Sequence, residues 1–377
     1  MTVFRSISTV LLGASLALAT LGCSGSGLTA VADEGQAAWQ AGAMAATANP
    51  HATEAALAML RRGGHAVDAA IAAHAVLGLV EPQSSGIGGG AFMLVYQRDE
   101  QAMVFHDGRE TAPQGATADM FMRDGKVMDF VQAWQSGMAV GVPGTVALYE
   151  GAHKEHGKLP WADLFQPAIR LASEGFKVSP RLADYLPRIA RMGRLDENPG
   201  AAEYFYPGGT ALQAGDLLKN PEYAATLKRI AKEGSSAFYR GEIAQAIAAA
   251  AQAEPNPGTL SVEDIAGYRS VQRDAVCGPY RQLTLCGATP PASSAAVIMM
   301  MGLYEQLAEP ANDHNADIAA FVDAQRLAYA DRDQFFGDPD AVSIPVRELL
   351  DPRYLEHRAG QRFAPAALPT HGEPRVV

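Results

Sequence analysis

The pattern of apolar and polar residues begins with two stretches of helical period separated by a pair of glycines. Asn49 and Pro50 stand where a helix begins, and apolar residues recur after them at helical spacing. Gly63 and Gly64 end this helix. Residues 67–79 are rich in alanine and apolar around most of the helical circumference. This pattern predicts a second helix that is buried.

Shorter apolar runs follow, and they predict a pair of strands. Residues 92–96 and 102–105 are separated by a charged turn, as expected for two paired strands. Helical patterns return at residues 162–174 and over residues 221–253, with an interruption near Gly234. The middle of the chain is therefore predicted to be mostly helical.

The last clear helix has a polar cap and one apolar face. We expect Asn315 to cap it and Gly337 to end it, because both residue types are typical of those positions. Four residues recur on one face at helical spacing, which is typical of a helix that packs through that face: Ile318, Phe321, Val322 and Tyr329.

Residues 277–286 predict a tight hairpin that turns at Arg281 and Gln282. With a two-residue turn, Cys277 and Cys286 face each other at a non-hydrogen-bonded pair, where antiparallel strands lie closest. Pro279 falls at another such position, where its missing N–H costs nothing. We predict a disulfide between Cys277 and Cys286 in an oxidising compartment, with two buried thiols as the alternative.

The composition is that of a globular protein large enough for a sizeable core. The chain has 377 residues, of which 48% are hydrophobic and 19% charged. Its formal net charge of −11 argues against nucleic acid as a partner, because phosphate binding needs a basic surface. A small anionic substrate is still compatible with this charge, since a single arginine can bind one.

The N-terminus has the features of an export signal. Residues 1–23 contain a positive start at Arg5 and a short apolar stretch that ends before Cys23. Gly22 and Cys23 fit the bacterial lipoprotein pattern, whereas Thr20 and Leu21 do not, so lipid attachment at Cys23 and simple cleavage both stay open. We expect an exported protein in the bacterial periplasm, with residues 24–35 as a flexible tether and 36–377 as the folded domain.

A glycine-dense segment leads into the first predicted strand. Gly86, Gly88 and Ala91 match the spacing of a dinucleotide-binding loop, but that loop needs a strand before the glycines and a helix after them. Here the order is reversed, so this function is excluded. The remaining interpretations are a turn whose backbone packs closely and a wall of a binding site.

Arg109 is the best candidate for a substrate contact. Its guanidinium is a planar set of donors that fits a carboxylate, although an arginine beside Asp107 and Glu110 is also typical of a surface ion pair. The histidines, including His106, show no nucleophile triad.

The aspartates at 331, 333, 338 and 340 lack the spacing of a calcium loop, and we interpret them as structural. Two cysteines without a nearby histidine give too few ligands for a metal. We therefore expect no metal site and no cofactor.

Several segments together resemble the large-subunit half of the γ-glutamyltransferases, which belong to the N-terminal-nucleophile hydrolases. The resemblance extends from Ala43 to Arg358, with order and spacing similar throughout. The segments that carry it are residues 63–70, 83–96, 107–113, 140–145, 158–161, 166–169, 237–241, 326–332 and 337–340. One departure lies at residues 290–296, where the family usually has two glycines after the serines.

The resemblance implies an α+β fold, an N-terminal-nucleophile hydrolase-like α/β/β/α sandwich that is incomplete without a small subunit. It also implies a precursor that cuts itself before a threonine, which becomes the nucleophile of the small subunit and forms the acyl-enzyme. We expect that threonine beyond Val377, and hence no catalytic residue and no activity in this chain alone. Thr370 is followed by His371 but not by an apolar strand, so we do not expect it to be the nucleophile.

Within this chain the resemblance assigns the substrate α-carboxylate to Arg109. It assigns the pocket wall to the segment that contains Ser84, Ser85, Gly86, Gly88 and Gly89. The implied substrates are glutathione and related small γ-glutamyl compounds, with transfer to amino acids, peptides or water. Two alternatives stay open: a related acylase of glutaryl or cephalosporin type, and a non-catalytic binding or scaffold protein.

Overall fold

The computed structural model describes residues 42–308, 314–361, 363–364 and 367–374. Residues 43–377 belong to one compact unit. The predicted export signal (1–23), the tether (24–35) and Cys23 lie outside the described residues. Within the described part, none of the helices combines the length and the apolar character needed to cross a membrane.

The first two helices form where the sequence predicts them. Helix α1 (Pro50–Arg61) is capped by Asn49, whose side chain accepts a hydrogen bond from the backbone of His51, and α2 (Ala66–Val80) is mostly buried. The Asn49 amide also donates to the buried carboxylate of Glu81 at 2.8 Å. This bond joins the start of α1 to the end of α2.

Asp68, on the first turn of α2, fastens this helix pair to a distant loop. Its Oδ2 atom accepts hydrogen bonds from the backbone N–H groups of His65, Lys158 and Leu159, at 2.8, 3.0 and 3.2 Å. The Asp68 side chain is fully buried, so these donors replace the water that the carboxylate loses on folding.

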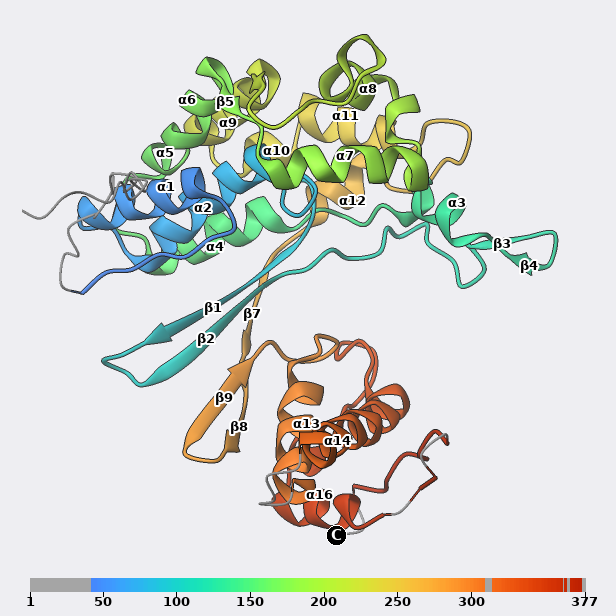
Figure 1. The fold of residues 1–377 in the computed structure, drawn as a ribbon. Helices are drawn as coiled ribbons and strands as arrows, with labels where there is room; N and C mark the ends of the chain where they lie inside the picture. The colour runs from blue at the N-terminus through green and yellow to red at the C-terminus, as the bar shows by residue number, and fades with distance from the viewer. Residues whose placement is uncertain (1–41, 309–313, 362, 365–366, 375–377) are drawn as a thin grey trace, which may run out of the picture. The chain divides into compact units, whose positions relative to one another are not determined.

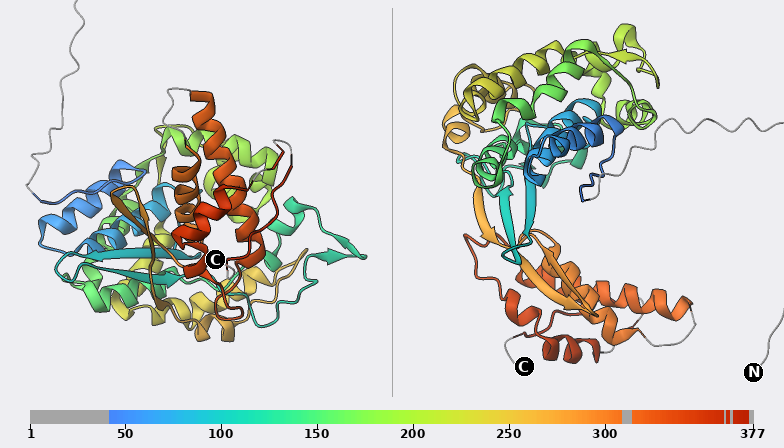
Figure 2. Two further views of the ribbon diagram at one scale, coloured as in Figure 1. Left: turned by 90° about the horizontal axis from the view of Figure 1, so that it is seen from below. Right: turned by 90° about the vertical axis from the view of Figure 1, so that its left-hand side faces the viewer.

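The predicted strand pair is the core of a three-stranded antiparallel sheet. Strands β1 (Ala91–Gln97) and β2 (Ala102–Gly108) pair along their whole length, and β7 (Val271–Asp274) joins β2 at its other edge (Figures 1 and 2). Helix α4 (Thr145–His156) packs against β1 and β2. The outward-facing apolar side chains of β1 are exposed, namely Phe92, Leu94 and Tyr96. One face of the sheet is thus covered by helix, while apolar side chains of β1 lie open on the other.

Short helices make up most of residues 130–267. The predicted helix at 162–174 is two helices, because Pro167 lacks the N–H that would continue the ladder across Phe165. The predicted 221–253 stretch is three helices that break at Gly234 and Gly241, both with positive φ. Besides α4, this region contains α3 (Phe130–Trp134), α5 (Trp161–Leu164), α6 (Gln166–Glu174), α7 (Pro180–Gly193), α8 (Pro199–Phe205), α9 (Pro221–Glu233), α10 (Ser236–Tyr239), α11 (Glu242–Ala251) and α12 (Val262–Gly267), with the two-residue strands β5 (Phe176–Lys177) and β6 (Leu217–Leu218). The two-residue strands β3 (Met122–Arg123) and β4 (Lys126–Val127) precede it.

The predicted hairpin is confirmed in position and register. Strands β8 (Val276–Tyr280) and β9 (Leu283–Gly287) pair so that Cys277 faces Cys286 and Pro279 faces Thr284. The two sulfurs are bonded in the structure, with Cα atoms 4.1 Å apart. Two-residue turns require positive φ, and Arg281 adopts a φ of 51°.

The C-terminal helices surround a buried ion pair. Asp331 on α14 (His314–Phe335) accepts hydrogen bonds from Arg358, from the hydroxyl of Tyr354 at 2.7 Å and from the backbone of Gly372 at 2.7 Å. Arg358 is 1% exposed, and both Arg358 and Tyr354 lie on α16 (Pro352–Ala359). The remaining elements here are α13 (Ser294–Leu307) and α15 (Val346–Leu349). Asp331 therefore has a structural role, as predicted.

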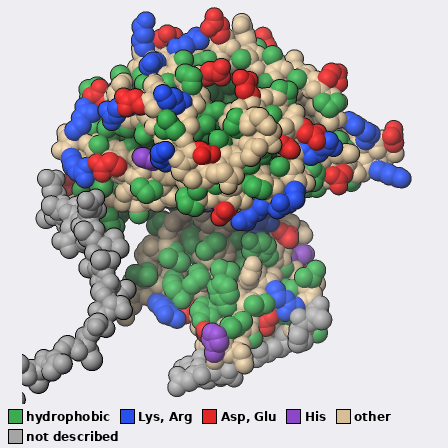
Figure 3. Space-filling view, turned by 45° about the horizontal axis from the view of Figure 1, so that its top comes forward, with side chains coloured by type: hydrophobic (Ala, Val, Ile, Leu, Met, Phe, Trp, Pro, Cys, Tyr) green, Lys and Arg blue, Asp and Glu red, His purple; other side chains and the backbone are tan. Residues whose placement is uncertain are grey.

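The orientation predicted for α14 is wrong. The helix begins at His314, so Asn315 lies inside it, and the apolar residues Ile318, Phe321, Val322 and Tyr329 are exposed. The buried face instead carries Ala324, Leu327, Ala328 and Asp331. Helical period alone does not tell which of two faces is covered, and the small residues allow α14 to pack closely on α13. Hydrophobic side chains gather over this C-terminal part in the lower half of Figure 3.

Candidate functional site

The backbone of Arg109 is held on both sides of the residue. Arg109 follows the last residue of β2, and its N–H donates to Asp107 Oδ1 at 2.9 Å. Its carbonyl oxygen accepts a hydrogen bond of 2.7 Å from the hydroxyl of Tyr268. Burial raises the pKa of Tyr268, and the nearby carboxylates of Asp107 and Glu110 raise it further. The hydroxyl therefore stays protonated and serves as a donor.

The lack of a side chain at Gly144 allows α4 to begin directly against Gly108, the last residue of β2. A Cβ at Gly144 would overlap the carbonyl oxygen of Gly108 and the hydroxyl of Tyr268. The N–H groups of Gly144 and Thr145 and the Thr145 hydroxyl all donate to the carbonyl oxygen of Gly89, at 2.9, 3.1 and 3.0 Å. The glycine segment and the Arg109 loop are thereby joined through the start of one helix.

Close packing of the glycine segment is confirmed only near its end. At Gly90, a Cβ would lie 2.8 Å from the backbone nitrogen of Glu110, whereas at Gly86 and Gly88 it would meet no atom within 4 Å. Contacts with the described residues therefore do not explain why glycine stands at positions 86 and 88. Of the preceding serines, Ser84 accepts a hydrogen bond from Arg181 at 3.2 Å.

The Arg109 guanidinium is accessible. Its side chain is 62% exposed, and its Nη1 forms an ion pair with Glu110 Oε2. The Asp107 carboxylate is paired with a different arginine. Arg273 Nε lies 3.0 Å from Asp107 Oδ2, and Arg273 also forms an ion pair with Asp340. This leaves Arg109 with Glu110 as its ion-pair partner and with much of its donor fork available to a ligand.

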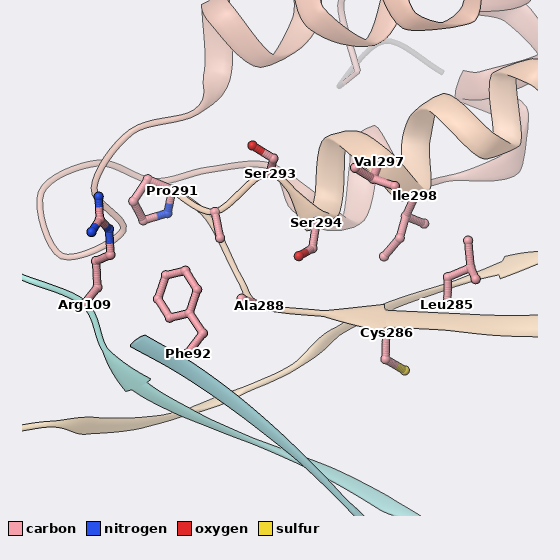
Figure 4. A pocket seen from close by; sticks show the side chains of 11 residues that line it. Phe92, Arg109, Leu285, Cys286, Ala288, Pro291, Ser293, Ser294, Val297 and Ile298 are labelled. Atoms are coloured by element: carbon pink, nitrogen blue, oxygen red, sulfur yellow. The ribbon is translucent and has the colours of Figure 1, made fainter. Parts of the chain in front are cut away.

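Arg109 borders a cavity of about 740 Å³ that reaches the N-terminus of α13 (Figure 4). This volume is in the range of small-molecule sites. The lining is mostly apolar, with polar groups from Arg109, Ser293 and Ser294; its members are Phe92, Arg109, Leu285, Cys286, Ala288, Pro291, Ala292, Ser293, Ser294, Val297 and Ile298. Arg109 also lines a second cavity, of about 340 Å³, together with Glu110 to Pro113 and Met138 to Gly141.

The structure brings together residues that the sequence pattern did not connect. Phe92 and the two serines line the cavity with Arg109, yet the serines stood out only as part of a departure from a family pattern. None of Ser84, Ser85, Gly86, Gly88 and Gly89 lines either cavity, so their place in a pocket wall stays a prediction.

His106 and Thr370 lie elsewhere. His106 is buried and its ring faces His156 on α4, and burial lowers its pKa despite the nearby Glu155. His106, Glu155 and His156 are the described residues whose side chains come close enough to hold a metal ion together. The Thr370 carbonyl accepts a hydrogen bond from Arg358, and Thr370 lines neither of the two cavities.

A comparison with protein families matches residues 52–371 to a model described as gamma-glutamyltranspeptidase. The chain belongs to this family. Glutathione hydrolase proenzyme from Bacillus subtilis (strain 168) is 34% identical over 326 residues, which are 84% of this chain and 54% of that protein. The acylase ACY 1 proenzyme from Pseudomonas sp. (strain SE83) is 35% identical over 324 residues, 84% of this chain and 57% of that protein. This member of the family thus spans about half the length of these curated relatives.

A solved structure agrees with the fold. The crystal structure of Helicobacter pylori gamma-glutamyltranspeptidase superposes with a TM-score of 0.79 at 31% identity, covering 89% of this chain and 95% of that chain. The α+β fold class of N-terminal-nucleophile hydrolase type is thereby confirmed. Helix α4 against β1 and β2 forms one covered side of the sandwich, and exposed apolar side chains of β1 mark its open side.

Proposed function

We propose that this chain is the large-subunit portion of an exported γ-glutamyltransferase that acts on glutathione and related γ-glutamyl compounds. The observation that carries the proposal is Arg109, whose backbone is fixed by Asp107 and Tyr268 while its guanidinium borders the larger cavity. A bidentate donor on a fixed backbone at the edge of a cavity suits the α-carboxylate of a γ-glutamyl group. Family membership supports the same assignment.

The nucleophile in this proposal is a threonine of the small-subunit portion. Its hydroxyl attacks the γ-carbonyl carbon and the amine leaves, so that a γ-glutamyl ester forms on the threonine. An amino acid, a peptide or water then attacks that ester and regenerates the hydroxyl. The relatives' names as proenzymes and the share of their length that this chain spans support a two-part precursor. On this proposal the large-subunit portion alone has no activity.

The open face of the sheet supports a small-subunit partner. Phe92, Leu94 and Tyr96 are apolar, adjacent and exposed on β1, and an apolar surface of this kind is typical of a face that another chain covers. We place the second sheet of the sandwich against it.

Export rests on the sequence of residues 1–23, with the periplasm as the compartment in a bacterium of the diderm type. The bonded Cys277 and Cys286 suit an oxidising compartment. The proposal leaves two outcomes open for the N-terminus, lipid attachment at Cys23 and simple cleavage. Mass spectrometry of the mature N-terminus distinguishes them.

The proposal is tested with the complete precursor and its Arg109→Ala variant, assayed with a γ-glutamyl anilide and a dipeptide acceptor. We expect kcat/KM to fall by a factor of about 30 or more, because truncating one partner of a charge pair costs about 2–5 kcal/mol. Arg98→Ala is the matched control, since Arg98 is an exposed arginine of the β1–β2 turn. Equal kinetics for Arg109→Ala and wild type would refute the role of Arg109.

An acylase is the second candidate, because the acylase relative is as similar to this chain as the glutathione hydrolase is. The same precursor is therefore assayed with a glutaryl amide, which lacks the α-amine. Preference for the glutaryl amide favours the acylase. Turnover of neither substrate by a processed, folded protein favours a non-catalytic binding or scaffold role.

A further inference from the structure

Two buried histidines from different elements point their ring nitrogens at each other. His106 lies on β2 and His156 is the last residue of α4, and their Nε2 atoms are 3.1 Å apart. Glu155 precedes His156, and its two carboxylate oxygens lie 3.9 Å from His106 Nε2 and 3.7 Å from His156 Nε2. With one ligand atom taken from each residue, the three atoms form a triangle whose sides are all within 4.8 Å.

The size of this triangle fits a four-coordinate metal ion. For metal–ligand bonds of about 2.0–2.1 Å, the ligand atoms of a tetrahedral site lie about 3.3–3.4 Å apart. The two nitrogens, 3.1 Å apart, are slightly closer than this. Each carboxylate oxygen is slightly farther than this from its nearer nitrogen, and rotation of the Glu155 side chain brings one oxygen closer to both nitrogens. We propose that His106, Glu155 and His156 bind one Zn²⁺ ion, with water as the fourth ligand.

The chemistry of the ligands favours zinc over calcium or magnesium. Two imidazole nitrogens and one carboxylate oxygen form a donor set that suits zinc, whereas calcium and magnesium prefer oxygen ligands alone. Glu155 is 39% exposed, so an ion reaches the site from solvent and a water molecule completes its coordination. Both histidines are buried, which fixes two of the three ligands before the ion arrives.

Neighbouring side chains orient His156. The Gln97 amide nitrogen lies 3.2 Å from His156 Nδ1, and the His65 ring stacks on the His156 ring at 5.6 Å with planes 20° apart. An outer partner of this kind selects the ring nitrogen that carries the proton. Binding of the ion at His156 Nε2 requires the ring proton on Nδ1. The Gln97 amide must therefore turn, so that its carbonyl oxygen takes the place of the amide nitrogen that now lies against Nδ1.

The proposed ion would join β2 to the C-terminal end of α4. The N-terminal end of the same helix already contacts Gly108 and the glycine segment, so both ends of α4 would be fixed to the last residues of β2. The role is therefore structural, at a place separate from the Arg109 cavity, whose lining contains none of the three ligands. This proposal departs from the expectation from sequence that the chain has no metal site, and the experiment below decides between the two.

The experiment uses the complete protein without an affinity tag, stripped of metal with a chelator. Titration with Zn²⁺ in a calorimeter should show one bound ion per chain, and Co²⁺ in its place should give the visible absorption bands of a tetrahedral site. Glu155→Gln should weaken Zn²⁺ binding at least about tenfold, because it removes a charged ligand. Zn²⁺ should raise the Tm of the wild type but not that of Glu155→Gln.

Matched controls separate the site from general effects. Glu174→Gln changes an exposed glutamate near a helix end, and His51→Gln changes an exposed histidine; both should bind Zn²⁺ like the wild type. Because Glu155 is partly exposed, its variant should fold, and His156→Gln provides a second test. No Zn²⁺ binding by the wild type, or equal binding by wild type and Glu155→Gln, would overturn the proposal and leave a hydrogen-bonded histidine pair.

Discussion

The hydroxyl of Tyr268 donates a hydrogen bond of 2.7 Å to the carbonyl oxygen of Arg109. The Tyr268 ring in turn stacks on Tyr239 with planes 9° apart, and the hydroxyl of Tyr239 donates to the carbonyl oxygen of Pro143 at 2.9 Å. Burial raises the pKa of both tyrosines, which keeps both hydroxyls protonated. Two stacked tyrosines thus hold the arginine loop and the start of α4 in one arrangement.

Removal of the Tyr268 hydroxyl should loosen Arg109 without removing its charge. For Tyr268→Phe in the complete precursor, we expect KM for a γ-glutamyl substrate to rise about three- to tenfold, since one hydrogen bond contributes about 0.5–1.5 kcal/mol. We expect kcat to change little, because Arg109 binds a part of the substrate that does not react. Steady-state kinetics measure both constants. Tyr185→Phe, on α7, is the control, and an unchanged KM for Tyr268→Phe would contradict the positioning role.

Replacement by alanine should destabilise the protein at Gly144 but not at Gly88. Gly144→Ala should lower the free energy of unfolding by about 2–3 kcal/mol, because its Cβ would overlap the Gly108 carbonyl and the Tyr268 hydroxyl. Gly88→Ala should leave stability within about 0.5 kcal/mol, because its Cβ meets no atom within 4 Å. Urea denaturation of both variants measures these changes.

The same Gly88→Ala variant tests the predicted pocket wall. If Gly88 borders the substrate or the small subunit, its variant should be stable as a large-subunit fold and still lose activity or processing of the precursor. Normal activity together with normal stability would show that the prediction for this glycine is wrong.

The buried pair of Asp331 and Arg358 should be costly to break. Asp331→Ala removes a carboxylate that accepts from Arg358, Tyr354 and Gly372, and leaves the Arg358 cation buried without it. We expect a loss of about 3–5 kcal/mol in the free energy of unfolding. Asp333→Ala, which breaks an exposed pair with Arg332 on the same helix, should cost about 1 kcal/mol or less. If urea denaturation shows a similar loss in the free energy of unfolding for both variants, burial of the Asp331–Arg358 ion pair does not increase the cost of breaking it.

Local signals in the sequence predicted several of the elements, because caps, turns and periods depend on neighbouring residues, although helices such as α7 and α16 were not predicted. Asn49 begins α1 as expected, and the hairpin turn places Cys277 opposite Cys286. The same signals did not predict which face of α14 is covered, since that depends on α13 and on chain segments far away. The sequence pattern identifies a helix or a strand, whereas the face of it that is buried depends on the elements that pack against it.

The candidate site was predictable only where its residues are contiguous. Arg109 stands within a recognisable run, but its partner Tyr268 and the cavity serines lie 159 or more residues further along the chain. The two histidines of the His106–His156 pair are separated by 50 positions in the sequence, and they form another long-range contact. No spacing rule connects such residues, because strand pairing and the docking of α4 bring them together.

A histidine outside both sites should give stability a dependence on pH. His74 on α2 accepts a hydrogen bond at Nδ1 from the hydroxyl of Tyr149, whose pKa is raised by burial. Burial also lowers the pKa of His74 below its ordinary 6.5. The unfolded chain therefore binds a proton near pH 6.5 that the folded chain binds only at lower pH. As the pH falls below about 6.5, the free energy of unfolding should decrease by up to about 1.4 kcal/mol per pH unit for this residue, until the folded pKa is reached.

His74→Gln removes this titration, and its side-chain oxygen can still accept from Tyr149. Urea denaturation between about pH 5 and 8 should therefore show a smaller loss of stability on acidification for His74→Gln than for the wild type. Some loss should persist, because burial also lowers the pKa values of His65 and His106. His51→Gln, at an exposed position on α1, should leave the wild-type slope unchanged. If His74→Gln and the wild type lose stability equally as the pH falls, His74 is protonated in the folded protein as readily as in the unfolded chain, and burial does not control its charge.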